Sequence, residues 1–277
     1  MDEKSFLSEY SIENYERPSV TTDIAVFALR YEENENYRLN SSKKLSILLI
    51  KRGEYPFKGM WALPGGFLRK GETVEECAVR EIFEETSVKP LSLISAGVFS
   101  KPDRDPIGWI ISNAFASVIG KAEKNPEAGD DAADAQWFDV TFERTDESMY
   151  RLKLVYEDTE LLSVLSERKT SFGKIFFEAD EKSMLAFDHA EIIASSLAEL
   201  RQRAKNFDVI FDFLPEKFTL TELQSVQEAI TNISVTPANF RRKISGYVSE
   251  TDEYTQGDGH RPARLYKRNN LQGACKI

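Results

Sequence analysis

The chain of 277 residues carries 46 acidic and 36 basic side chains, a net charge of −10, and an ordinary hydrophobic content of 41%. No apolar run approaches the roughly 18 residues that a membrane-spanning helix needs, and the acidic N-terminus lacks the apolar core of a signal peptide. Two cysteines, Cys77 and Cys275, are too few for a disulfide framework. We therefore expect a cytoplasmic protein without membrane contact. Its length is sufficient for two domains.

The charge is spread unevenly along the chain. Residues 200–277 hold 12 basic and 9 acidic residues, or +3, which leaves 24 basic and 37 acidic residues, or −13, in the rest. An acidic body with a mildly basic end indicates a local anion-binding surface in the C-terminal part.

The chain up to residue 205 has the pattern of an α/β domain. A helix is expected to begin at Thr73, because Thr73 and Glu76 have the spacing of a capping box. Residues 185–205 have helical periodicity and predict a second helix, which either packs on the sheet or serves as a connector. Residues 141–180 are ambiguous. Segments rich in Val, Ile and Leu predict five strands, at residues 20–30, 45–52, 93–100, 109–119 and 135–140.

Acidic residues gather on one face of the helix that begins at Thr73. Glu81, Glu84 and Glu85 are three and four positions apart, so they are neighbours on the helix surface. Carboxylates are the ligands that hard ions such as Mg²⁺ or Mn²⁺ prefer. The preceding Gly65-Gly66 lets the backbone approach a ligand closely. A solvated acidic helix is the simpler alternative, but the shared face and the glycine pair favour a metal site.

From residue 206 the pattern changes to short helices. Thr219 and Glu222 form a second capping box, and Thr236 followed by Pro237 predicts the start of a helix that runs to about Tyr247. A polar hairpin follows, at residues 248–254 and 264–267, and helices followed by a hairpin predict a winged helix-turn-helix. We expect Phe240, Ile244 and Tyr247 to be buried, with Asn239, Arg242, Lys243 and Gly246 on the opposite face.

The basic helix and hairpin are candidates for DNA contact. A helix of this kind can enter a major groove, and cations of the wing can meet phosphate. The alternative is that the winged fold serves protein contact or dimerisation. The candidate DNA-binding residues are Asn239, Arg241, Arg242, Lys243, His260, Arg261 and Arg264.

The stretch that carries the acids resembles the Nudix box, G-x5-E-x7-R-E-U-x-E-E-x-G-U, where U is a bulky apolar residue. One position departs from it: Ser87 replaces the last glycine, at a helix exit where a positive φ is common. The matching residues are Gly66, Glu72, Arg80, Glu81, Ile82, Glu84, Glu85 and Val88.

The chain from about residue 17 to 268 also resembles the NrtR type, Nudix-derived transcriptional regulators of NAD-related or sugar metabolism. The resemblance implies a Nudix α/β/α sandwich with a mixed sheet in residues 1–205, then a small winged helix domain in residues 206–277. It also implies an ADP-ribose-like nucleotide as ligand, a DNA operator and a homodimer. The carrying segments are residues 101–106, 108–109, 129–132, 137–138, 185–189, 239–243 and 260–266.

The resemblance gives the site residues their expected roles. Metal ions held by Glu81, Glu84 and Glu85, with the Gly65 carbonyl as a further ligand, would neutralise a pyrophosphate and activate a water. Arg80 is expected to orient the neighbouring carboxylates, and Glu72 to complete the metal shell through water. A loop with Asp103, Arg104 and Asp105 is expected to meet ADP-ribose, unless it is only a turn stapled by Asp–Arg pairs. Asp130 or Asp131 is a candidate base or ligand, and His189 is expected to be a structural or inter-domain contact.

Three hypotheses for the function follow. The first is a metal-dependent ADP-ribose pyrophosphohydrolase that also binds DNA. The second is a regulator that senses ADP-ribose or a sugar metabolite with little or no hydrolysis. The third is a Nudix enzyme whose winged domain serves assembly. The intact acids favour catalysis, and the basic helix favours DNA binding.

Overall fold

The computed structural model describes residues 2–31, 43–120, 126, 132–255 and 262–269. Its largest element is a ten-stranded mixed sheet in the order β10-β9-β8-β7-β2-β1-β6-β5, in which β3 also pairs with β2 and β4 with β1. Every pairing in this sheet is antiparallel except that of β1 with β6. The strands are β1 (Ser19–Tyr31), β2 (Lys43–Arg52), β3 (Trp61–Ala62), β4 (Gly65–Phe67), β5 (Ser92–Phe99), β6 (Ile110–Val118), β7 (Ala132–Arg144), β8 (Met149–Tyr156), β9 (Thr159–Lys169) and β10 (Ile175–Ala179).

Two helices cover opposite faces of this sheet: α2 (Val74–Thr86) and α3 (His189–Lys205). The central strand β1 is buried on both sides, because its alternate residues contribute to two hydrophobic clusters. Ile24 and Val26 pack in the cluster that contains Ile82 of α2, and Ala25 and Phe27 belong to the cluster on the α3 side. The α/β/α sandwich with a mixed sheet expected from the sequence is therefore confirmed.

The structure resolves two uncertain segments of the chain. The ambiguous residues 141–180 form the end of β7 and the strands β8, β9 and β10, which extend the sheet as an antiparallel meander. The helix expected from residue 185 begins at His189. Leu185 makes a parallel bridge with Trp61, and Phe187 adopts a φ of 53°, so residues 185–188 cannot continue the helix.

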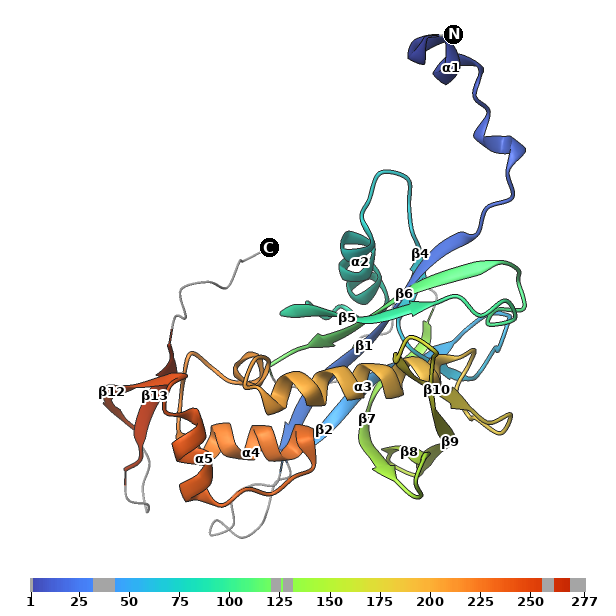
Figure 1. The fold of residues 1–277 in the computed structure, drawn as a ribbon. Coiled ribbons are helices and arrows are strands. Elements are labelled where there is room, and N and C mark those ends of the chain that lie inside the picture. Colours follow the sequence, from blue (N-terminus) through green and yellow to red (C-terminus); the bar gives the residue numbers. More distant parts are fainter. Residues whose placement is uncertain (1, 32–42, 121–125, 127–131, 256–261, 270–277) are drawn as a thin grey trace.

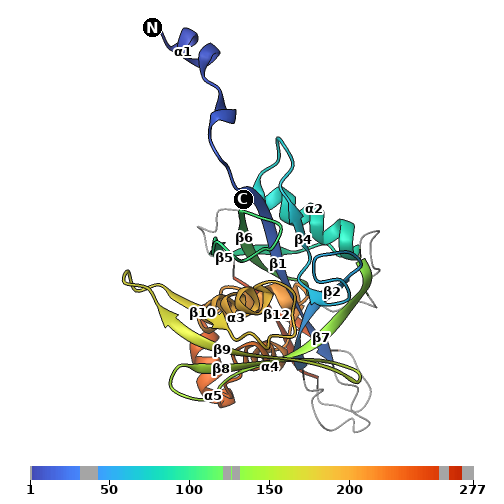
Figure 2. The ribbon, with the colours of Figure 1, turned by 90° about the vertical axis from the view of Figure 1, so that its right-hand side faces the viewer.

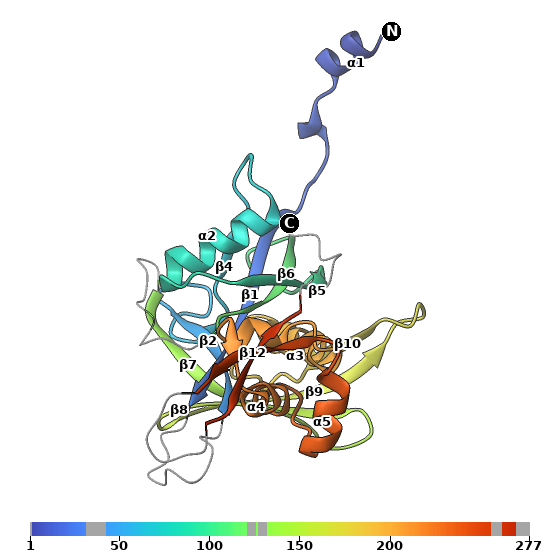
Figure 3. The same ribbon diagram turned by 90° about the vertical axis from the view of Figure 1, so that its left-hand side faces the viewer.

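The C-terminal part is a winged helix, as expected. Its sheet has the order β11-β13-β12. The last helix ends at Ile244, earlier than expected, and Tyr247 is only partly buried, whereas Phe240 and Ile244 are fully buried. Figure 3 shows this part beside α3. Its elements are η2 (Ile210–Phe213), β11 (Lys217–Phe218), α4 (Leu220–Thr231), α5 (Pro237–Ile244), β12 (Val248–Tyr254) and β13 (Arg264–Arg268).

Helix α3 joins the two parts of the chain through a single continuous core. Arg201 of α3 donates to the carbonyl of Phe142 in β7 (2.9 Å) and to that of Ile230 in α4 (3.2 Å). Gln227 of α4 donates to the carbonyl of Ala204 (3.3 Å). The proposed boundary at 205/206 thus falls at the end of α3, where the hydrophobic core continues from one part into the other.

The N-terminal residues project away from the body of the molecule as an arm with α1 (Glu3–Glu9) and a single turn, η1 (Ile12–Asn14). Helix α1 buries none of its residues. In the part of the chain that the structure describes, no helix is long and apolar enough to cross a membrane.

Candidate functional site: the acidic helix, the glycine loop and the adjoining cavity

Helix α2 presents its acids to the site because its ends and its apolar stripe are fixed. The expected capping box forms: Thr73 N donates to Glu76 (2.8 Å) and Glu76 N donates to Thr73 Oγ1 (3.2 Å). The helix ends at Ser87, which adopts the left-handed conformation (φ 57°) that the pattern's glycine would favour. Cys77 lies in the buried stripe, where burial raises the pKa of its thiol, so it is a packing residue.

Arg80 is the hub of the acidic face. Its guanidinium donates to both carboxylate oxygens of Glu72 (3.1 and 2.7 Å), to Glu81 (2.6 Å) and to Glu84 (3.0 Å). The hydrogen bonds from Arg80 lower the pKa of Glu72 to about 2. Arg69 forms a second, bidentate pair with Glu84 (3.2 and 3.0 Å). The contacts of Arg80 fit an arginine that orients carboxylates rather than one that contacts substrate.

Gly65 and Gly66 begin strand β4, and we call them, with the preceding Leu63 and Pro64, the glycine loop. Close packing requires both glycines. A Cβ on Gly66 would lie 2.5 Å from Cδ of Glu81, so the carboxylate of Glu81 occupies the space that a side chain would fill. A Cβ on Gly65 would overlap the backbone carbonyl of Thr22 in β1. The Gly65 amide donates to Glu85 Oε2 (2.8 Å), which ties the loop to helix α2.

Glu85 is a carboxylate in an unfavourable setting. Burial, with the nearby charges of Glu81 and Asp23, raises its pKa to about 8. A cation beside Glu81 and Glu85 would relieve this repulsion and favour the ionised form.

The donor chemistry fits a divalent ion, but the side chains are not gathered around one. Within the described ranges, no group of three His, Cys, Asp or Glu residues has the geometry to hold a metal. Oxygens of Glu81 and Glu84 are instead engaged by Arg80, and those of Glu84 also by Arg69. The arginine contacts use one oxygen of Glu81 and both oxygens of Glu84.

A cavity opens beside the glycine loop, and Arg104 lies in its wall. Arg104 does not pair with Asp103 or Asp105, its neighbours in the loop. The Arg104 side chain, 3% exposed, donates instead to Asp188 (2.7 and 2.9 Å) and to Asp23 (3.1 Å). The cavity is lined by Thr21, Asp23, Ile50, Arg52, Leu63, Gly65, Gly66, Phe67, Arg104, Asp105, Ile107, Phe187 and His189.

The other loop acids have different surroundings. Asp105 lines the cavity and accepts a hydrogen bond from the Ile107 amide (2.8 Å), whereas Asp103 is exposed. Asp130 and Asp131 lie outside the described residues. The structure therefore brings Arg104 and Asp105 to the glycine loop and leaves Asp103 at the surface.

Sequence reasoning missed Asp23 and assigned His189 only a contact role. Asp23 accepts from Ser112 Oγ (2.5 Å) and Arg104, and its Oδ1 lies 3.5 Å from His189 Nε2. Burial opposes ionisation of Asp23, but His189 and Arg104 outweigh it and hold its pKa well below the usual range. A lone acid inside an apolar strand was the available signal, because buried charges are paired or functional.

The candidate DNA-binding residues of α5 are exposed. Asn239, Arg241, Arg242 and Lys243 are all exposed, and Arg242 donates to Asn239 (3.3 Å). In the wing, Arg264 is engaged by Glu250 and by the hydroxyl of Tyr254. His260 and Arg261 lie outside the described residues.

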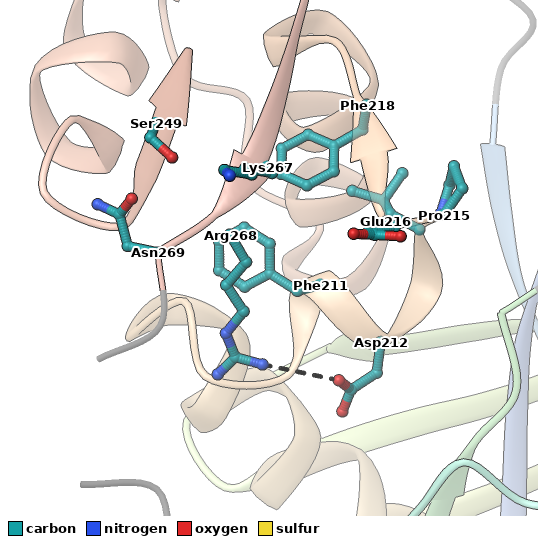
Figure 4. A pocket seen from close by; sticks show the side chains of 10 residues that line it. Phe211, Asp212, Pro215, Glu216, Phe218, Ser249, Lys267, Arg268 and Asn269 are labelled. Carbon is teal, nitrogen blue, oxygen red and sulfur yellow. Dashed lines mark ion pairs between the residues drawn. The ribbon is translucent and has the colours of Figure 1, made fainter. Parts of the chain in front are cut away.

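A second cavity lies where the wing meets the segment after α3 (Figure 4). Arg268 reaches across it to Asp212 (3.9 Å) and lies over the ring of Phe211, 5.0 Å from its centroid. Arg268 therefore ties β13 to η2.

Comparisons with known proteins agree with this architecture. A model of the NUDIX domain matches residues 24–153, and a model of the NrtR DNA-binding winged helix domain matches residues 210–267. A MutT/nudix family protein from Enterococcus faecalis has a similar crystal structure, with a TM-score of 0.73 and 30% identity, over 97% of this chain and 94% of that one. The chain therefore belongs to the Nudix family, and its Nudix domain is followed by a winged helix domain of the NrtR kind.

The chain is also similar to two proteins with more particular roles. The ADPR responsive transcriptional repressor NtrR of Acinetobacter baylyi is 29% identical over 269 residues, which cover 96% of this chain and 88% of the relative. An ADP-ribose pyrophosphatase of Methanocaldococcus jannaschii is 56% identical over 99 residues, which cover 35% of this chain and 57% of that protein.

Proposed function

We propose that this protein is a Mg²⁺- or Mn²⁺-dependent Nudix hydrolase that splits ADP-ribose, or a related nucleoside diphosphate derivative, into AMP and ribose 5-phosphate. We propose further that it is a cytoplasmic, homodimeric DNA-binding regulator. The observation that carries the hydrolase is the complete acid set of α2, Glu81, Glu84 and Glu85, of which Glu81 and Glu85 contact the glycine loop beside a cavity. The similarity to an ADP-ribose pyrophosphatase supports the substrate class.

Residues of the chain would bind the metal and the nucleotide and restrain the carboxylates. Glu81, Glu84, Glu85 and the Gly65 carbonyl would hold the metal, which when bound neutralises the pyrophosphate and activates a water. Arg80 restrains the carboxylates through its bonds to Glu72, Glu81 and Glu84. The wall of the cavity, with Arg104 and Asp105, would hold the remainder of the nucleotide. Water adds to one phosphorus, the bridging P–O bond breaks, and two monophosphates leave.

Hydrolysis can be tested with two variants of the same helix. Glu84→Gln should lower kcat by about two orders of magnitude or more, because it removes a carboxylate from the site. Glu75→Gln is the matched control, since Glu75 is exposed on α2 and makes no contact with Arg80. Wild-type protein that turns over no nucleoside diphosphate derivative with either metal would refute the hydrolase.

The second candidate is a regulator that binds ADP-ribose with little or no turnover. It is favoured by the arginine contacts that hold Glu81 and Glu84 and by the similarity to an ADPR responsive repressor. Nucleotide binding measured by calorimetry, together with absent turnover, would select this candidate.

DNA binding is carried by the exposed basic face of α5, with Arg242 and Lys243. Because residues 1–199 carry a net charge of −13, contact with a duplex is confined to the C-terminal part, where α5 and the wing offer the cations. A homodimer would present two such helices and recognise half-sites spaced by whole helical turns. Electrophoretic titration with the promoter of the protein's own gene cluster at low salt tests this.

A further inference from the structure

We propose that His189 is a positioning residue for the glycine loop: its imidazole holds the Leu63 amide and thereby sets the position of Gly65 and Gly66 against helix α2. This inference rests on the hydrolytic function proposed above, because the loop supplies the backbone of that site. His189 belongs to α3, on the opposite face of the sheet from the acids.

The loop is held from both faces of the sheet. On one side, the Leu63 amide donates to Nδ1 of His189 (2.9 Å). On the other, the Gly65 amide donates to Glu85 of α2 (2.8 Å). Between them, the carbonyl of Pro64 accepts from the Ile24 amide of β1 (2.9 Å). Two side chains from two helices thus fix consecutive amide donors of the loop, since Pro64 has no N–H.

The imidazole is itself held in one orientation. Because Nδ1 accepts from Leu63, the ring proton is on Nε2, which faces Asp23 Oδ1 at 3.5 Å. Asp23 is fixed in turn by Ser112 and by Arg104. His189 is only 4% exposed, so water cannot readily replace its contact with Leu63.

The contact between His189 and Leu63 matters because the glycine loop is closely packed against its neighbours, so that even a small shift would change the site. The Gly65 backbone is packed against Thr22, and the Glu81 carboxylate occupies the space that a Cβ on Gly66 would fill. A shift of the loop would therefore displace the Gly65 carbonyl relative to Glu81 and Glu85. A displacement of about 1 Å can cost on the order of 100-fold in rate.

Two substitutions of similar size separate positioning from packing. His189→Asn keeps an acceptor at the place of Nδ1, whereas His189→Gln moves its polar group to the place of Nε2, toward Asp23. Both remove the ring, so both should lower the melting temperature by similar amounts. We expect kcat to fall about 10- to 100-fold in His189→Gln and by a clearly smaller factor in His189→Asn, with the loss in kcat larger than any change in KM in both variants.

Hydrogen exchange of the Leu63 amide gives a readout that does not depend on turnover. It should be faster in His189→Gln than in His189→Asn. Equal kcat values in the two variants, or a faster exchange that leaves kcat unchanged, would overturn the inference.

The failure of the hydrolase is distinguishable, because wild type would then be inactive too. In that case calorimetric affinity for Mn²⁺ replaces kcat as the measure. Weaker binding by His189→Gln than by His189→Asn supports the positioning role, and equal affinities refute it.

Discussion

Replacement of Gly66 by alanine adds one carbon atom next to the Glu81 carboxylate and so tests whether the glycine loop positions the acids of α2. The added Cβ would lie 2.5 Å from Cδ of Glu81, whereas ordinary contact begins at 3.4 Å, so the carboxylate must retreat by about 1 Å. The end of a Glu side chain can do this at small cost to the fold. Its bond with Arg80 (2.6 Å) would be strained and its geometry at the site lost.

We therefore expect Gly66→Ala to lower kcat by roughly 100-fold while the melting temperature changes little. Steady-state hydrolysis of ADP-ribose with Mg²⁺ and a thermal melt measure the two effects. Gly120→Ala is the control, because its Cβ would find no atom closer than 3.6 Å. Gly65→Ala gives the contrast: its Cβ overlaps the Thr22 carbonyl, so β4 and β1 must separate and stability should fall. A Gly66→Ala variant with wild-type kcat would refute the reasoning.

Three further predictions concern charge. The pKa of Glu85 is raised to about 8 in the folded protein, whereas its unfolded value is 4.5, so the metal-free protein should lose up to about 4 kcal/mol of stability as pH rises from 5 to 8. Mg²⁺ should restore more stability at pH 8 than at pH 5. Denaturant midpoints that do not change with pH would contradict this prediction. Arg104→Ala should destabilise by about 3–5 kcal/mol in urea unfolding, because it strands the buried Asp23 and Asp188, and a wild-type midpoint would argue against that network. Arg242→Ala with Lys243→Ala should abolish operator binding in gel titration and leave kcat unchanged; a joint loss of both activities would show that the sites are not separate.

Local signals in the sequence predicted most of the fold. Capping boxes at Thr73 and Thr219 placed the starts of α2 and α4 correctly, since each depends on residues only three apart. The start of α3 was predicted too early. The bridge between Trp61 and Leu185 joins residues far apart in the chain, and helical periodicity carries no trace of such a pairing.

In the candidate site, too, the features carried by one helix were predicted, and those formed by distant segments were not. The spacing of Glu81, Glu84 and Glu85 was visible because one helix carries them all. The network of Asp23, Arg104, Asp188 and His189 was not, since β1, a loop and α3 each contribute to it. The resemblance singled out Arg104 and His189, but only the three-dimensional arrangement gives their partners.

The guanidinium of Arg201 has a consequence for how the molecule unfolds. It donates to carbonyls of β7 and α4 beside a hydrophobic core that spans both parts, so separation of the parts would break these hydrogen bonds and expose apolar surface to water. A scan of heat capacity should therefore show one cooperative transition rather than two. A nucleotide that binds beside the glycine loop would then raise the melting temperature of the winged helix as well, by the same free energy that it adds to its own domain.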